Sequence, residues 1–106
     1  MARDIPPGFA DVSVIVAAYQ AADTVTRSLT SIAAQTLKPT EVVVVDDGSS
    51  DATFETAQAF EPHMNGIRLR VVRMDTNQGA GAARNRAIEE SSGGTLAFLD
   101  ADDEWL

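Results

Sequence analysis

The apolar run Val12-Ser13-Val14-Ile15-Val16-Ala17 decides the fold, because its apolar residues do not alternate with polar ones. A half-buried strand alternates, whereas a continuous apolar run is typical of a strand that is covered on both faces, as in a parallel sheet. Three further runs of this kind follow at fairly even intervals: Val42–Val45, Leu69–Val72 and Leu96–Leu99. Together the runs predict four strands of a parallel sheet.

A helix is predicted between the first two runs. Its apolar residues recur at i, i+4, i+7 and i+8, the spacing of one helical face: Val25, Leu29, Ile32 and Ala33. Asp23 or Thr24 is the expected N-cap, and Leu37-Lys38-Pro39 is expected to close the segment.

Two further helices complete the order β-α-β-α-β-α-β. A shorter helix is predicted through Phe54–Phe60, and another from Ala82 to about Ser91, opened by Gly79-Ala80-Gly81. Alternating strands and helices with short, right-handed connections form a parallel α/β layer of Rossmann-like type. A chain of 106 residues is at most one domain, and we expect residues 1–11 to be a lead-in and residues 12–106 to be the domain.

Composition and charge exclude several classes of protein. The net charge of −8 argues against non-specific binding of nucleic acid or of an anionic membrane surface. The absence of cysteine excludes disulfides, thiolate zinc sites and cysteine nucleophiles, and the single histidine, His63, excludes a site of several histidines. No stretch reaches the roughly 18 apolar residues of a membrane span, and the N-terminus lacks the apolar core of a signal peptide. The cytosol is therefore the expected compartment.

Polar residues follow every apolar run. They are Tyr19-Gln20, Asp46-Asp47-Gly48, Met74–Gly79 and Asp100–Asp103. Because ligands of parallel α/β sheets bind outside the carboxyl ends of the strands, these residues predict a binding site at one edge of the sheet.

Three of these groups each allow two interpretations. Asp46-Asp47-Gly48 is either an ordinary turn or a carboxylate site for a base or a ribose. Tyr19 is either a core aromatic or a surface on which a nucleobase stacks. Gly79-Ala80-Gly81 opens a helix that carries Arg84 and Arg86, and it is either a plain helix start or a phosphate-binding one.

The acidic run Asp100–Glu104 is harder to explain as a solvated loop, because it begins directly at the end of a buried strand. Carboxylates held so close together repel one another unless a cation intervenes. Hard divalent ions such as Mg²⁺ and Mn²⁺ take carboxylate oxygens together with substrate phosphates as ligands. The run therefore predicts a divalent cation site that can also hold a phosphate.

Five ordered segments resemble the N-terminal half of the inverting glycosyltransferases with the GT-A fold, of the family 2 type. They are Val12–Gln20, Ser28–Thr36, Val43–Asp51, Asn77–Ile88 and Phe98–Trp105, which together span nearly the whole chain from residue 12 onward. The resemblance implies a fold, a parallel Rossmann-like layer that forms the nucleotide-binding half of a GT-A domain.

The resemblance implies roles at the nucleotide. Ala17 and Tyr19 would line the base pocket, Asp47 would bond to the base, and Asp46 would support the turn or the ribose. This family often has Pro in place of Ala17 and Asn in place of Gln20, but neither replacement removes an indispensable group.

The resemblance also implies roles at the diphosphate. Arg84 and Asn85 would face the nucleotide, and Asp100-Ala101-Asp102 would form an Asp-x-Asp motif whose Asp100 contacts the ribose. Asp102 would bind the metal, Mn²⁺ or Mg²⁺, with Asp103 as its nearest competitor.

The function implied is metal-dependent transfer of a sugar, with inversion, from a nucleoside-diphosphate sugar to an acceptor hydroxyl, as in polysaccharide biosynthesis. A UDP-sugar is the expected donor, and the acceptor stays open. The general base is expected beyond Leu106, so this chain would be a truncated, donor-binding fragment that does not transfer sugar alone. Self-association through exposed core residues is expected, and the full-length enzyme could lie at the inner face of the membrane.

Three alternatives remain at this point. A receiver-like, Mg²⁺-binding signalling module would also place Asp46-Asp47 and Asp100 around a cation, but it leaves the βα unit Val12–Lys38 surplus. A Rossmann dehydrogenase is disfavoured because the first βα turn contains no glycine. A non-catalytic nucleotide-binding or assembly role for the fragment stays open.

Overall fold

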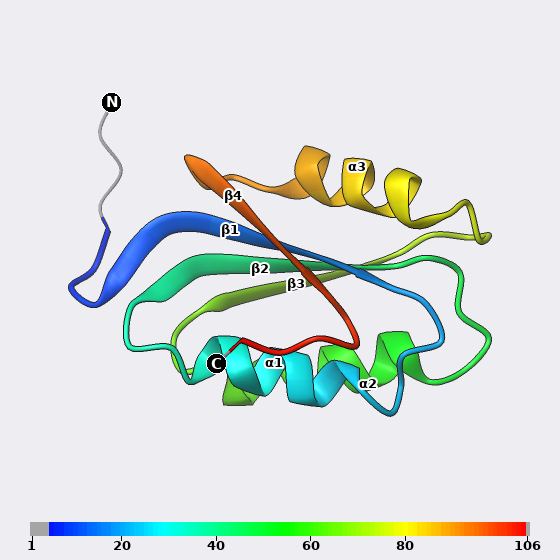
Figure 1. Cartoon of the computed structure of the whole chain (residues 1–106), viewed down its shortest axis with the longest axis horizontal. Helices are drawn as coiled ribbons and strands as arrows, with labels where there is room; N and C mark the ends of the chain where they lie inside the picture. Colours follow the sequence, from blue (N-terminus) through cyan, green and yellow to red (C-terminus); the bar gives the residue numbers. More distant parts are fainter. Residues whose placement is uncertain (1–4, 106) are drawn as a thin grey trace.

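The computed structural model describes residues 5–105 and contains a parallel sheet with the strand order β3-β2-β1-β4. Its strands are β1 (Phe9–Ala18), β2 (Lys38–Asp46), β3 (Arg68–Arg73) and β4 (Thr95–Asp100). The helices are α1 (Val25–Ala33), α2 (Thr53–Ala59), the 3-10 helix η1 (Glu61–His63) and α3 (Ala80–Glu90). Helix α3 lies over one face of the sheet, and α1 and α2 lie over the other (Figure 1). The predicted parallel α/β layer is confirmed.

Three elements start two or more residues before the predicted position. Strand β1 begins at Phe9, inside the expected lead-in, because Phe9 and Ala10 pair with Lys38 and Pro39 of β2. Lys38 and Pro39 therefore open a strand as well as follow a helix, and a proline is tolerated there because it stands at a strand start. Helix α3 begins at Ala80, two residues before the predicted start.

The helix ends also test the predicted caps. Thr24 is the N-cap of α1, one of the two residues expected, but its side chain makes no capping hydrogen bond. The N-cap of α3 is Gly79, whose φ of 98° suits glycine.

Within residues 5–105, every helix is too short or too polar to span a bilayer.

The core consists of two apolar clusters, one on each face of the sheet. Alternate residues of the central strands point to opposite faces: Val14, Val16, Val42 and Val44 pack towards α1, and Ile15, Val43 and Val45 pack with Ala83 and Ala87 of α3. This two-sided burial explains why the runs of β1 and β2 are continuously apolar. The same interpretation is wrong for β4, a sheet edge on which Phe98 is 52% exposed.

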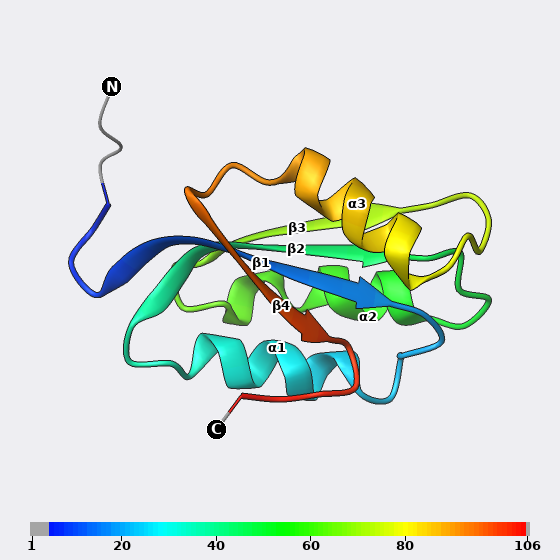
Figure 2. The same ribbon diagram turned by 45° about the horizontal axis from the view of Figure 1, so that its top comes forward.

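The register of β1 brings the strand ends together. Ala17 pairs with Val45 of β2 on one side and with Asp100 of β4 on the other, and Ala18 pairs with Asp46. The strands run in the same direction, so their carboxyl ends share one edge (Figure 2). The predicted convergence of polar residues at this edge is confirmed.

A buried carboxylate, Glu41, lies near the amino ends of the strands. Glu41, 2% exposed, accepts hydrogen bonds from Ser13 Oγ (2.7 Å) and from the amide and hydroxyl of Ser92. The Gly93 amide in turn donates to Ser13 Oγ (2.7 Å). Burial would raise the pKa of Glu41, but these hydrogen bonds and the nearby Arg68 outweigh it and hold the pKa below its ordinary value. The network ties the segment before β4 to β1 and β2.

We expect the Glu41→Gln variant to lose about 1 to 3 kcal/mol of unfolding free energy at pH 7, because it removes the charge that these donors surround. The pKa of Glu41 is depressed in the folded state, so its contribution is fully present above the unfolded value near 4.5 and is lost as pH falls through the folded value. The difference between variant and wild type in urea unfolding should therefore shrink on acidification. Glu89→Gln, on the exposed surface of α3, is the control. An equal loss at every pH would contradict this role of the charge.

Candidate functional site

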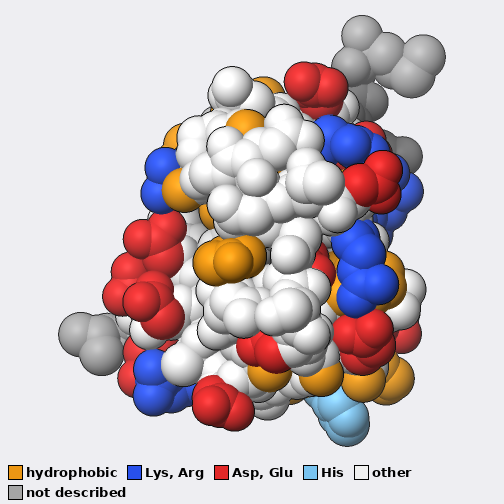
Figure 3. Space-filling model, turned by 90° about the vertical axis from the view of Figure 1, so that its right-hand side faces the viewer, with side chains coloured by type: hydrophobic (Ala, Val, Ile, Leu, Met, Phe, Trp, Pro, Cys, Tyr) orange, Lys and Arg blue, Asp and Glu red, His pale blue; other side chains and the backbone are white. Residues whose placement is uncertain are grey.

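Two adjoining hollows lie at the carboxyl edge of the sheet. One has a volume of about 350 Å³ and reaches Arg84, Asp100 and Asp102; the other has about 330 Å³ and reaches Asp47 and Asn77. Three residues line both hollows: Ala17, Tyr19 and Ala80. Figure 3 faces this end of the molecule and shows acidic side chains gathered along its left side. The two hollows therefore form one continuous candidate site.

Tyr19 stands between the two hollows at the end of β1. Its ring is not buried in the core, since the residue is 54% exposed. The alternative that it is a core aromatic is therefore wrong. An exposed aromatic ring above a concave surface can stack on a planar ligand.

Asp46 holds the turn that follows β2. It is fully buried, its Oδ1 accepts a hydrogen bond from the Ser49 amide (3.1 Å), and its Oδ2 lies 3.6 Å from Nε of Arg73. Asp46 lines neither hollow, so its geometry matches the expected support of the turn and not a contact to ribose.

Asp47 connects the turn after β2 to the loop before α3. Its Oδ1 accepts from the Gln78 amide (2.8 Å), and its Oδ2 accepts from the Gly79 amide (2.9 Å) and from Asn77 Nδ2 (3.0 Å). The residue is only 3% exposed, yet it lines the second hollow. A carboxylate offers about four acceptor positions, so three donors leave about one for a ligand.

Gln20 has a role that the sequence did not indicate. Its φ of 50° is left-handed, and its side-chain carbonyl accepts from the amides of Ser50 (2.7 Å) and Asp51 (3.3 Å). The backbone amide of Gln20 donates to Ser49 Oγ (2.8 Å). Gln20 thus fixes the loop after β1 against the loop after β2. The family that the sequence resembles often has Asn at this position. Because Asn tolerates the left-handed conformation, this preference could have indicated the left-handed backbone at Gln20.

Arg84 and Asn85 have different surroundings. Arg84 Nη2 donates to Asp100 Oδ1 (3.2 Å) and lines the first hollow. Asn85 is exposed and lines neither hollow, because the next residue of a helix points about 100° away. The structure therefore brings Arg84, and not Asn85, to the site.

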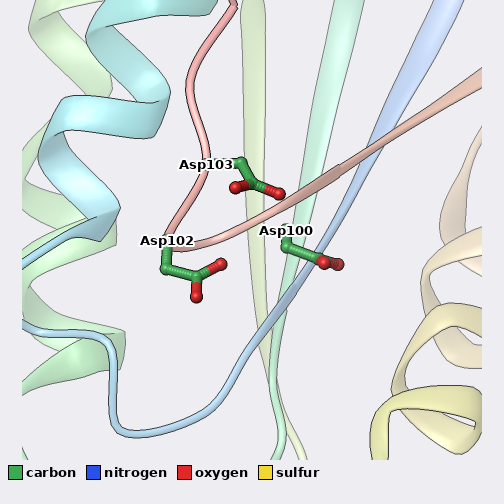
Figure 4. Close-up of side chains that lie close together, drawn as sticks. All are labelled: Asp100, Asp102 and Asp103. Atoms are coloured by element: carbon green, nitrogen blue, oxygen red, sulfur yellow. The ribbon is translucent and has the colours of Figure 1, made fainter.

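Asp100, Asp102 and Asp103 form a cluster of exposed carboxylates. Each offers one oxygen, and these oxygens lie within 4.8 Å of one another at the end of β4 (Figure 4). Carboxylate oxygens at this spacing repel one another and suit a hard divalent cation, so the donor set fits Mg²⁺ or Mn²⁺. Because Asp100 is already paired with Arg84, Asp102 and Asp103 are the freer ligands.

Comparison with known proteins identifies the class. Residues 13–106 match the family described as Glycosyl transferase family 2, and this chain belongs to that family. It is 44% identical over 93 residues to the succinoglycan biosynthesis protein ExoO of Rhizobium meliloti (strain 1021), a match that covers 88% of this chain and 26% of that protein. Family membership sets aside the receiver and dehydrogenase alternatives.

Solved structures confirm the fold. S. aureus TarS 1-349 in complex with UDP-GlcNAc matches with a TM-score of 0.78 and 36% identity, over 88% of this chain and 27% of that one. The mannosyltransferase PcManGT from Pyrobaculum calidifontis, in complex with GDP-Man and Mn²⁺, matches with a TM-score of 0.83 and 31% identity, over 90% of this chain and 28% of that one. The expected fold, the nucleotide-binding part of a GT-A domain, is thereby confirmed. The chain spans just over a quarter of the length of these relatives.

A substitution at Gly48 would test the contact between the turn after β2 and the loop before α3. Its φ is +70°, and a Cβ there would lie 2.6 Å from the backbone N of Asn77 and 2.6 Å from the carbonyl C of Thr76. We therefore expect Gly48→Ala to lower the unfolding free energy by about 3 kcal/mol or more in urea denaturation. Gly79→Ala (φ 98°, ψ 159°) also falls in a backbone region nearly restricted to glycine, but its Cβ would meet nothing within 4 Å, so it should lose about 1 to 3 kcal/mol from backbone strain alone, less than Gly48→Ala. Equal losses would show that the two loops do not pack as described.

Proposed function

We propose that this chain binds the donor of an enzyme that transfers a sugar from a nucleoside-diphosphate sugar to an acceptor hydroxyl, with inversion and with the help of a divalent cation. The observation that carries the proposal is the adjacency of the two hollows, one beside the buried Asp47 and one beside the carboxylates of β4. Relatives solved with UDP-GlcNAc and with GDP-Man and Mn²⁺ support a ligand of this class.

The hollow beside Asp47 is proposed to hold the nucleobase. Tyr19 and Ala17 offer an apolar wall, and the remaining acceptor position of Asp47 faces the base. Uracil, thymine and guanine present a ring N–H donor to a carboxylate, whereas adenine and cytosine present an amino donor beside a ring nitrogen whose lone pair the carboxylate repels, so Asp47 favours the first three bases. A UDP-sugar remains the preferred donor.

The hollow beside β4 is proposed to hold the diphosphate. Asp102 and Asp103 would hold Mg²⁺ or Mn²⁺, and Arg84 would orient Asp100 towards the ribose. The first backbone amides of α3, at Ala80 on the wall of this hollow, favour a bound anion. When bound, the cation supplies Lewis-acid stabilisation of the departing nucleoside diphosphate.

The acids near the hollows are all engaged, so we propose that the general base comes from elsewhere in the complete enzyme. Asp47 is bound by three donors and Asp100 by Arg84, and the other two carboxylates would be held by the cation. This chain alone would then bind the donor without transferring sugar, and transfer by the purified chain would contradict that.

The cytoplasmic location and an inner-membrane position of the full enzyme stay predictions.

Self-association also stays a proposal. Two large apolar side chains, Leu37 and Phe98, are more than half exposed and could contact a second copy. Light scattering of the purified chain over a range of concentrations would detect it, and a monomer at every concentration would contradict it.

A panel of nucleoside diphosphates tests the base proposal. With Mn²⁺ present, we expect UDP and GDP to raise the melting temperature of the chain, and ADP and CDP to bind at least about tenfold more weakly, because Asp47 cannot donate to their ring nitrogens. Thermal shift ranks the ligands, and calorimetric titration gives the dissociation constants. Equal affinity for all four would show that Asp47 does not recognise the base.

Removal of single carboxylates tests the metal proposal. We expect Asp102→Asn and Asp103→Asn each to weaken Mn²⁺ binding in the presence of UDP by about tenfold or more, because each removes a charged oxygen ligand. Electron paramagnetic resonance measures the free Mn²⁺. Glu61→Gln in η1 removes one negative charge far along the chain from the cluster and serves as the control. Wild-type affinity in both aspartate variants would place the cation elsewhere.

A further inference from the structure

The loop that carries the acidic cluster is held by helix α1. Ser28 Oγ donates to the carbonyl oxygen of Ala101 (3.0 Å) and also contacts the carbonyl oxygen of Asp103. Arg27 Nη2 donates to the carbonyl oxygen of Asp102 (3.3 Å). Three successive carbonyl groups of the loop therefore face one turn of α1, and Figure 4 shows this helix beside the loop.

A second serine extends the contact one turn further along the helix. Ser31 Oγ accepts a hydrogen bond from the Trp105 amide (2.9 Å) and donates to the carbonyl oxygen of Ser28 (2.7 Å). Ser28 is fully buried and Ser31 is 9% exposed, so water does not readily replace either hydroxyl. Ser28 and Ser31, three residues apart, lie on the same face of the helix.

The side chains of the cluster have little else to position them. Within residues 5–105, no hydrogen bond or ion pair is formed by the side chains of Asp102 and Asp103, whereas Asp100 is paired with Arg84. Both free aspartates are exposed and repel each other. Their positions therefore depend on the backbone of the loop, and that backbone is fixed by α1.

We propose that Ser28 is a positioning residue of the cation site, which holds the loop backbone so that Asp102 and Asp103 stay close enough to share one ion. This inference rests on the proposed function, since it assumes that the cluster binds a divalent cation. Without the hydroxyl, the carbonyl groups of Ala101 and Asp103 lose their donor, and the repelling carboxylates can separate before a cation arrives. A preorganised site binds more tightly because less ordering is needed on binding.

The test compares Ser28→Ala with Thr30→Ala in the full 106-residue chain. Thr30 is exposed and its hydroxyl donates to the carbonyl oxygen of Thr26 in the same helix, so its loss leaves the loop untouched. With UDP present, Ser28→Ala should bind Mn²⁺ about tenfold more weakly by electron paramagnetic resonance, and Thr30→Ala should match wild type. Uridine, which carries no phosphate, should bind both variants equally, because its base would lie beside Asp47 and its ribose beside Asp100, which pairing with β1 and Arg84 hold without Ser28.

Trp105 gives a second readout that does not involve the metal. It is the only tryptophan of the chain, and it is partly buried against the core next to α1. In Ser28→Ala we expect its fluorescence to be quenched by acrylamide about twofold more readily than in wild type and in Thr30→Ala. Ser31→Ala, which removes the acceptor of the Trp105 amide, should show the same change in quenching if Ser28→Ala proves too unstable to measure.

The outcomes separate this inference from the proposed function. If wild type binds Mn²⁺ and folded Ser28→Ala binds it equally well, the positioning role is refuted and the proposed function stands. Equal losses of Mn²⁺ and uridine in Ser28→Ala would show a general structural role and would also refute it. If wild type binds no Mn²⁺ in the presence of UDP, the metal proposal fails, and this inference fails with it.

Discussion

The parallel register of β1 between β2 and β4 is the constraint on which the rest of the structure depends. Ala17 lies opposite Val45 on one side and Asp100 on the other, so the chain leaves these strands at the same level. A slip of one residue would exchange Val14 and Val16 with Ile15 between the two clusters, so each side chain would meet neighbours to which it is not fitted. Burial of the two central strands thus determines where the polar residues emerge.

The carboxylates at the two ends of the sheet differ in their burial and in the hydrogen-bond donors around them. At the amino end, Glu41 is buried and surrounded by hydroxyl and amide donors, which stabilise a charge that no ligand needs to reach. At the carboxyl end, Asp46 and Asp47 are likewise buried and hydrogen-bonded, but Asp102 and Asp103 are exposed and lack such donors among the described residues. In a chain with a net charge of −8, this difference marks one end as structural and the other as open to a cation.

Apolar runs and the polar residues that follow them were sufficient to predict the strands, their parallel arrangement and the edge that holds the site. They predicted Asp47 and the cluster after β4 as neighbours, because these residues follow strand ends directly, whereas Arg84, inside α3, was assigned to the site by the resemblance to the family. Hydrogen bonds between distant segments were not predictable in this way. The left-handed Gln20, the early start of β1 at Phe9 and the hydroxyl of Ser28 all depend on partners 29 to 75 residues away, which periodicity does not encode.

If the carboxyl edge of the sheet forms a single nucleotide site, a bound nucleotide should perturb both hollows at once. Backbone amide chemical shifts of the ¹⁵N-labelled chain, measured while UDP is added with Mg²⁺, test it most directly. Shift changes are expected at Gln78 and Gly79, beside Asp47, together with Asp100–Asp103, and none at Ser92 and Gly93 near the amino ends of the strands. Changes confined to one of the two hollows, or changes centred on Ser92 and Gly93, would contradict it.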